Sequence, residues 1–326
     1  MESSNQQSPH EARTGLLVLL LAVVAAVLAA YVPLFLIIAP ALWAYAGART
    51  RPYAILLPAA VFAYAMFTFE PTVAAAAYTA GALLAAVILL VLLTHGFSNS
   101  DTVLILCGVF LVMMYAVVCL PGLLEGRQAY ADIQARMGDV RAFYANGAAF
   151  YAQISPEAVK TVQQMLDTMY DAVPTTFVAV LCIFASVLGL GNLLFFRAFC
   201  RKQTQIKLSP MRAFRDWTLP RSMTLGLFAI LIGSIVLEFT GWAFAESFSV
   251  TANILLCIPL FLQGISVVDF MLSRAPKNIT VARTLTYIGL GVLYQWFLFP
   301  LVLVGVFDQI FHVRDRMRGI PPKAAA

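Results

Sequence analysis

The stretch "TVAAAAYTAGALLAAVILLVLLT", residues 72–94, contains no charged side chain. A helix that crosses a bilayer needs about 20 apolar residues, because it rises about 1.5 Å per residue through a hydrocarbon core of about 30 Å. Similar apolar runs recur along the chain, which is 61% apolar and only 11% charged. The sequence therefore predicts an all-α, polytopic membrane protein with apolar segments at 15–31, 34–46, 53–68, 72–94, 102–120, 174–197, 222–241, 250–273 and 281–311.

The number of spans depends on two of these segments. Residues 281–311 are long for one helix and have basic residues on both sides, so we expect two short spans that turn near Phe299 and Pro300. Residues 15–46 are expected to turn near Tyr31 to Pro33. This reading predicts about ten transmembrane helices, with eight as the lower alternative.

The distribution of lysine and arginine predicts the orientation. Seven lie in 197–221, whereas 68–71, 95–101 and 242–249 have none. Because basic loops stay on the cytoplasmic side, we expect both termini in the cytoplasm and the chain in a bacterial cytoplasmic membrane. The predicted parts are a tail (1–14), five helices (15–120), an extracytoplasmic insert (121–173), a sixth helix (174–197), a basic loop (198–221), C-terminal helices (222–311) and a basic tail (312–326).

The insert has the pattern of two amphipathic helices. Ser155 as N-cap, Pro156 at the first helical position and Glu157 in the first turn predict where the second helix begins. We expect the two helices to pair as a hairpin. Helices lying on the membrane surface are the alternative, but six acidic against four basic residues disfavour binding to anionic lipid. Apolar residues recur every three or four positions in both helices, at Tyr130, Ile133, Met137, Val140 and Tyr144, and at Val159, Val162, Leu166, Met169 and Val173.

The first apolar segment has a stripe of small residues. Ala22, Ala26 and Ala30 follow one another at intervals of four, which places them on one helix face and lets a second helix approach closely. Packing within the protein is favoured over docking of a separate membrane subunit.

Polar residues inside apolar segments are the candidate ligand-binding or polar-pathway residues, because burying them in hydrocarbon is costly unless they are paired or face a cavity. Hydrogen bonds between helices and ion pairs are favoured over a solute or proton pathway. The candidates are Asn192, Glu238, Gln263, Ser266, Asp269 and Asp308.

Several of these candidates have expected neighbours. Gln263, Ser266 and Asp269, together with Ser273, fall within an arc of about 120° on one helix. Asp269 and Asp308 are expected near the cytoplasmic surface, where they can be neutralised by Arg274, Arg314 or Arg221.

The sequence contains no motif that predicts catalysis. HExxH, GxSxG, Walker-type and GxGxxG motifs are absent, and no histidine or lysine lies deep in a span. Five cysteines and three histidines are scattered without ligand spacing, so we expect no metal, no disulfide and no cofactor. The net charge of +5 belongs to loops and gives no reason to expect a nucleic-acid partner.

The basic loop contains "KLSPMRAFRDWTLPRS", residues 207–222. We expect it to be folded against the membrane, with Arg212, Arg215 and Arg221 near lipid phosphates, Asp216 paired with a neighbouring arginine, and Trp217 at headgroup level.

Three stretches together resemble the YybS-like family of bacterial membrane proteins of unknown function. They are "LSPMRAFRDWTLPR" at 208–221, "FLQGISVVDF" at 261–270 and "GVFDQIFHVRDRMR" at 305–318. The resemblance implies that the first six helices are similar to the substrate-binding component of energy-coupling-factor transporters, with the first helix offered to a coupling partner.

Two functions follow as hypotheses. One is transport, with a small solute held in the first six helices. The other is a non-enzymatic scaffold or assembly factor of the cell envelope, with partners at the outer hairpin or the basic loop. Transport predicts an enclosed pocket, whereas the scaffold predicts a filled core and an exposed apolar stripe on residues 130–173.

Overall fold

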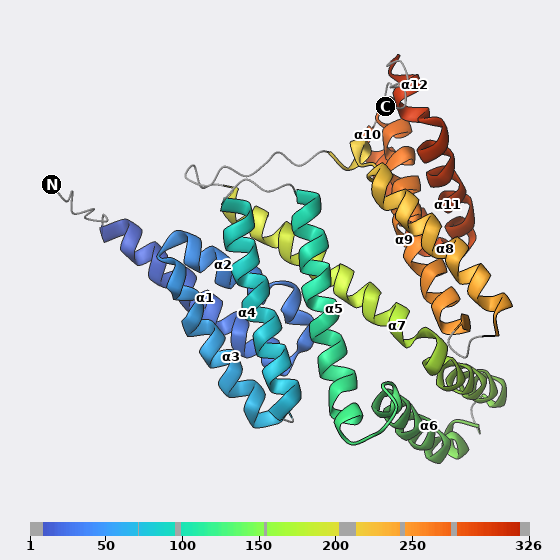
Figure 1. The fold of residues 1–326 in the computed structure, drawn as a ribbon, viewed down its shortest axis with the longest axis horizontal. Coiled ribbons are helices and arrows are strands. Elements are labelled where there is room, and N and C mark those ends of the chain that lie inside the picture. Colours follow the sequence, from blue (N-terminus) through green and yellow to red (C-terminus); the bar gives the residue numbers. More distant parts are fainter. Residues whose placement is uncertain are drawn as a thin grey trace. The chain divides into compact units, whose positions relative to one another are not determined.

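The computed structural model describes residues 9–70, 72–94, 99–152, 155–201, 213–241, 245–274 and 279–319, and their regular structure is entirely helical (Figure 1). The predicted all-α class is therefore confirmed. The chain divides into two compact units, residues 1–209 and 210–326, which are described separately.

The first unit contains a bundle of six helices with an additional hairpin. Proline begins two short 3₁₀ turns, where its missing N–H and fixed φ are tolerated, and these turns separate the first three helices. The chain thus turns after Tyr31, as predicted. The elements are α1 (Pro9–Tyr31), η1 (Pro33–Ile37), α2 (Ala39–Arg49), η2 (Pro52–Ile55), α3 (Leu56–Phe69), α4 (Thr72–Thr94), α5 (Asn99–Leu124), α6 (Ala131–Ala152) and α7 (Pro156–Cys200).

Large aromatic and aliphatic side chains fill the core of this unit. Trp43 meets Phe62 edge to face at 5.6 Å, and both are fully buried together with Phe110 and Phe196. Ala22 and Ala26 are also fully buried, and Ala30 is partly buried, where α1 packs against α2 and α3. The alanine stripe is therefore used for packing inside the unit.

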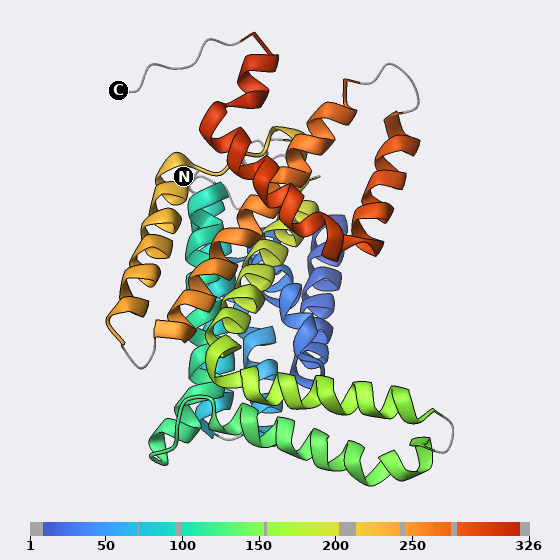
Figure 2. The same cartoon turned by 90° about the vertical axis from the view of Figure 1, so that its right-hand side faces the viewer.

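The predicted helical hairpin is present, but its second helix does not end at Pro174. α7 begins at Pro156 after Ser155, as predicted, and continues through Pro174 as one helix of 45 residues. Proline removes one helical hydrogen bond and clashes with the preceding turn, so it bends the helix. Figure 2 shows this bend: α6 and the first part of α7 run antiparallel to each other, and across the direction of α4 and α5.

The second unit is held together by close packing of two glycine-containing helices. A Cβ atom on Gly264 of α9 would collide with the carbonyl group of Leu301, and one on Gly305 of α11 with that of Leu260. Only glycine permits backbones to approach this closely. The elements are η3 (Phe214–Asp216), α8 (Arg221–Phe239), α9 (Ala245–Leu272), α10 (Ile279–Val292), α11 (Tyr294–Phe311) and α12 (Val313–Met317).

Six helices of the described residues are long and apolar enough to cross a membrane, and the bent pair α10–α11 makes a seventh candidate. The expected number of ten also counted shorter helices, namely α2, α8 and each half of the bent pair. The expected turn at Phe299 and Pro300 is wrong, because the chain bends by 117° near Leu293 and Pro300 lies inside α11.

Candidate functional site

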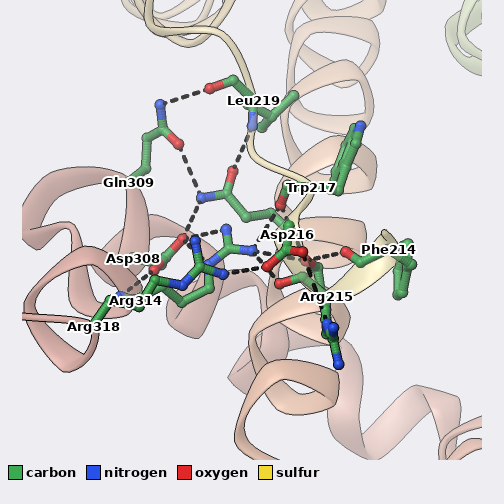
Figure 3. A network of polar contacts seen from close by, with 11 residues as sticks. Phe214, Arg215, Asp216, Trp217, Leu219, Asp308, Gln309, Arg314 and Arg318 are labelled. Atoms are coloured by element: carbon green, nitrogen blue, oxygen red, sulfur yellow. Dashed lines mark hydrogen bonds and ion pairs between the residues drawn. The ribbon is translucent and has the colours of Figure 1, made fainter. Parts of the chain in front are cut away.

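A buried network of polar side chains lies in the second unit, where α9, α11, α12 and residues 213–220 meet (Figure 3). Gln263 and Ser266 are fully buried, and Asp308 and Arg314 are 4% and 3% exposed. Burial of this many polar groups is tolerated only when they are hydrogen-bonded or paired. The network thus brings together three of the six predicted polar candidates.

The centre of the network is the ion pair of Asp308 and Arg314. Asp308 Oδ2 accepts hydrogen bonds from Arg314 Nη2 at 2.6 Å and from Nε at 3.0 Å. Asp308 Oδ1 accepts one from the backbone N–H of Arg314 at 3.2 Å. The chain turns back between the two residues at His312, whose φ of 49° lies in the left-handed region. This conformation costs a residue other than glycine about 1–2 kcal/mol.

Two glutamines extend the network to the loop before α8. Gln263 Nε2 donates to Asp308 Oδ2 and to Gln309 Oε1, both at 2.9 Å. The backbone of Leu219 is held from both sides: its N–H donates to Gln263 Oε1 and its carbonyl accepts from Gln309 Nε2, each at 3.3 Å. These bonds replace the backbone pairing that a non-helical segment lacks.

Arg314 and Ser266 hold the earlier part of the same loop. Arg314 Nη1 donates to the carbonyls of Arg215 at 3.1 Å and Trp217 at 2.9 Å, and to Ser266 Oγ at 2.9 Å. The Ser266 hydroxyl lies 2.7 Å from the carbonyl oxygen of Phe214 and 3.0 Å from that of Trp217. Residues 213–220 are therefore folded, as predicted, whereas residues 207–212, Arg212 included, and the side chain of Arg221 lie outside the description.

Two other aspartates also form ion pairs. Asp216 pairs with Arg215 at 3.8 Å, as expected, and in addition with Arg318. Asp269 lies 2.7 Å from Nε of Arg283 on α10, rather than beside Arg274. The two atoms are close enough for an ion pair, but their geometry is not that of a hydrogen bond. The hydrogen bond between these side chains runs from Arg283 Nη2 to Asp269 Oδ2 and is long, at 3.5 Å.

Arg274 has another role. Its guanidinium lies 4.6 Å from the centre of the Phe270 ring, which it shares with Arg318 at 4.8 Å. It also donates to the carbonyl of Met317 at 2.8 Å. The end of α9 is thereby attached to α12 by cation–π and hydrogen-bond contacts.

The remaining polar candidates lie apart from this network. Asn192 is fully buried in the first unit, where its amide donates to Leu36 O at 2.8 Å and Leu188 O at 2.9 Å and accepts from Ala41 N–H at 3.0 Å. It therefore bridges the break between η1 and α2. Glu238 is exposed at the end of α8, and Ser273 bonds the carbonyl of Phe270 in its own helix.

The chemistry of these sites is that of packing and positioning. Gln263, Ser266, Asp308, Arg314 and Asn192 are each engaged with several partners. Among the described residues, no group of three or more His, Cys, Asp or Glu side chains is arranged to hold a metal ion. The network attaches the loop and the C-terminal helix to the membrane-spanning helix α9.

A second kind of site lies on the α6–α7 hairpin. Two hollows of about 330 and 310 Å³ are lined there by residues that include Arg141, Tyr144, Gln163, Asp167 and Tyr170. Arg141 pairs with Asp167 at 2.6 Å and lies over the ring of Tyr170 at 4.9 Å. These contacts join the two helices across their polar side.

Sequence reasoning missed Gln309, Arg283 and Arg318 as partners in the second unit. Gln309 directly follows Asp308 near the end of an apolar helix. This pair of adjacent polar residues could have indicated that Gln309 also takes part in the network. Arg283 lies on a separate helix and Arg318 on a separate segment from the residues they contact. No spacing in the sequence relates them to Asp269 and Asp216.

Comparison with known proteins is consistent with this architecture. A search of curated proteins and a search of solved structures found no match. Residues 17–309 match the model of a family described as "Predicted membrane protein (DUF2232)", and the chain therefore belongs to this family of membrane proteins.

Proposed function

We propose that this protein is a non-enzymatic scaffold or assembly factor of the bacterial cytoplasmic membrane, with both termini in the cytoplasm and a protein partner on the α6–α7 hairpin. The observation that carries the proposal is the exposed polar side of the hairpin, where Arg141 and Asp167 lie at two shallow, open and adjoining hollows. The centre of the first unit, by contrast, is occupied by Trp43, Phe62, Phe110 and Phe196.

The polar side of the hairpin suits a protein rather than a small molecule. Small-molecule sites usually enclose most of the ligand surface, whereas Arg141 and Asp167 at these hollows are 42% and 52% exposed. Residues 121–173 carry six acidic and four basic side chains. Charge complementarity therefore favours a partner surface with an excess of positive charge.

The polar network of the second unit supports a positioning role. Asp308 accepts from Arg314 and Gln263, and Arg314 also donates to Ser266 and to the loop backbone, so the two charges are neutralised internally. A general acid, base or nucleophile needs a free group within reach of a substrate. The network instead gives the cytoplasmic side an ordered surface on which a second partner can bind.

Crosslinking in cells tests the proposed contact. A photoreactive amino acid replaces Ala145, which lines both hollows, and we expect a discrete crosslinked protein band. Asp167→Arg should abolish that band, because it removes the ion pair with Arg141 and repels a positively charged partner. Asp139→Arg is the matched control, with the same charge change at an exposed position of α6 that lines neither hollow. No band at Ala145, or equal loss in both variants, would refute the proposal.

Transport is the second candidate, and a specific observation favours it. The indole N–H of Trp43 is buried in the first unit without an acceptor among the described residues. A buried donor usually has a partner, and a bound solute could provide one. The first unit also has six bundle helices, α1–α5 and α7, as the resemblance to substrate-binding components of energy-coupling-factor transporters implies.

Mass spectrometry of gently purified protein separates the two candidates. Transport predicts a retained small molecule that is lost from Trp43→Phe, which keeps the aromatic packing and removes the donor. The scaffold predicts no such molecule in either protein.

A further inference from the structure

The α6–α7 hairpin has a second, apolar side. Val140 and Phe143 of α6 are 48% and 82% exposed, and Met165 and Met169 of α7 are 56% and 48% exposed. We call these four residues the apolar side of the hairpin. Exposed side chains of this size and number are unusual on a helical pair that is surrounded by water.

The four residues lie on the same side of the hairpin. Each helix of the hairpin contacts the other through one line of residues along its surface. At 100° per residue, Phe143 and Met165 are rotated away from this line in the same sense, each in its own helix. Two antiparallel helices are related by a two-fold axis perpendicular to their common plane, so equal displacements fall on one side of that plane. Arg141, Asp167 and Tyr170 are displaced in the opposite sense, which places the hollows on the other side.

The bend of α7 indicates which way the apolar side faces. A helix bends away from its proline, and Pro174 lies on the side of α7 opposite Met165. The apolar side therefore lies on the inner side of the bend, toward the continuation of α7 in the bundle. Figure 2 shows the hairpin reaching sideways past α1, α4 and α5. The tip of the hairpin extends beyond these helices in this view.

The helix surface around Met165 is suited to lipid. In the same direction α7 presents Ala158, Thr161, Met169 and Ala172, none of which is charged. The hydroxyl of Thr161 donates to the carbonyl of Glu157 at 2.9 Å, so it needs no partner from water. The acidic residues of this part of α7, including Asp167, project to the other side.

We propose that the apolar side of the α6–α7 hairpin lies in the surface of the bilayer, with Phe143 and Met165 inserted among the lipid chains next to the bundle. The contact continues the lipid-facing surface of the helices that cross the membrane. Its affinity comes from apolar burial, because the hairpin has a net negative charge and cannot be attracted by anionic headgroups. The inference is independent of the proposed function, since the partner-binding hollows lie on the opposite side.

Depth measurements on the full-length protein test this arrangement. In a variant without its five native cysteines, single cysteines replace Phe143 and Met165 and carry an environment-sensitive fluorophore. Ala142→Cys and Gln164→Cys are the matched controls, because each is the preceding, exposed residue on another side of its helix. The labelled proteins are reconstituted in phosphatidylcholine vesicles, with and without phosphatidylglycerol.

We expect lipid-attached nitroxide to quench the labels at 143 and 165 several-fold more than those at 142 and 164, and aqueous iodide to give the reverse order. The pattern should be the same with and without anionic lipid. Equal iodide quenching at all four positions would overturn the proposal. So would protection of positions 143 and 165 from both quenchers, since that indicates cover by protein.

A second measurement needs no cysteine replacement. A photoreactive phenylalanine analogue at position 143 of the otherwise native chain should crosslink to phospholipid, detected as a lipid-sized mass increase on the peptide. The same analogue at position 142 should not. Crosslinking of position 143 to protein alone would overturn the proposal, even if the cysteine-free variant fails to fold.

Discussion

Replacement of Arg314 by methionine should destabilise the second unit strongly. Methionine keeps most of the volume, but it leaves the carboxylate of Asp308, which is 4% exposed, without its counter-charge. It also removes the guanidinium donor from Ser266 Oγ and from the carbonyl of Trp217. Breaking one partner of a buried ion pair costs about 3–5 kcal/mol, which corresponds to a fall in Tm on the order of 10 °C.

Thermal unfolding in detergent, followed by the fluorescence of the four tryptophans, measures this loss. Arg316→Met is the control, because Arg316 lies exposed on the same short helix. Limited proteolysis should cut residues 213–219 faster in Arg314→Met, since the loop loses its anchor. The double variant Arg314→Met with Asp308→Leu should recover much of the stability, because no isolated charge remains. Equal Tm values for Arg314→Met and Arg316→Met would refute the reasoning.

Three further substitutions, two of them with a matched control, test packing and hydrogen bonding. Gly264→Ala should lower the free energy of unfolding by about 1–3 kcal/mol through overpacking. Gly289→Ala, whose added Cβ lies in open space, should instead stabilise its helix by about 0.5–1 kcal/mol. Chemical or thermal unfolding of both variants measures this difference in sign. Asn192→Ala should cost about 1–3 kcal/mol for each of two backbone groups that it leaves unpaired, and faster hydrogen exchange at the start of α2 is the direct measurement. Ala26→Leu should be destabilising by about 1–3 kcal/mol, and Val27→Leu should change stability by less than about 0.5 kcal/mol; equal Tm values for these two variants would contradict the burial of the alanine stripe.

The helical elements were largely predictable because their signals are local. Apolar runs of membrane length predicted α1, α4, α5 and α9, and the Ser155–Pro156–Glu157 start predicted where α7 begins. The same local reasoning failed at Pro174 and Pro300. Both prolines lie inside continuous helices, because a long helix with tertiary contacts on both sides of a proline can bend without ending.

The candidate site was predictable only in part. The polar stripe of Gln263, Ser266 and Asp269 follows from helical periodicity, and the pairing of Asp308 with Arg314 follows from their short separation along the chain. The expected partners of Asp269 were Arg274, Arg314 or Arg221, and its nearest cation is instead Arg283. Arg283 lies on the next helix, so no spacing indicated which side chain would be nearest.

The sequence by itself determined that the chain is a helical membrane protein, since the hydrophobic requirement of a bilayer can be read from composition and segment length. It also indicated the apolar stripes of the two hairpin helices, because the helical period is fixed. Only the tertiary structure decided what the polar residues do. Asn192 bridges a helix break, and Gln263 and Arg314 hold a distant loop, because each contact joins segments that are far apart in the chain.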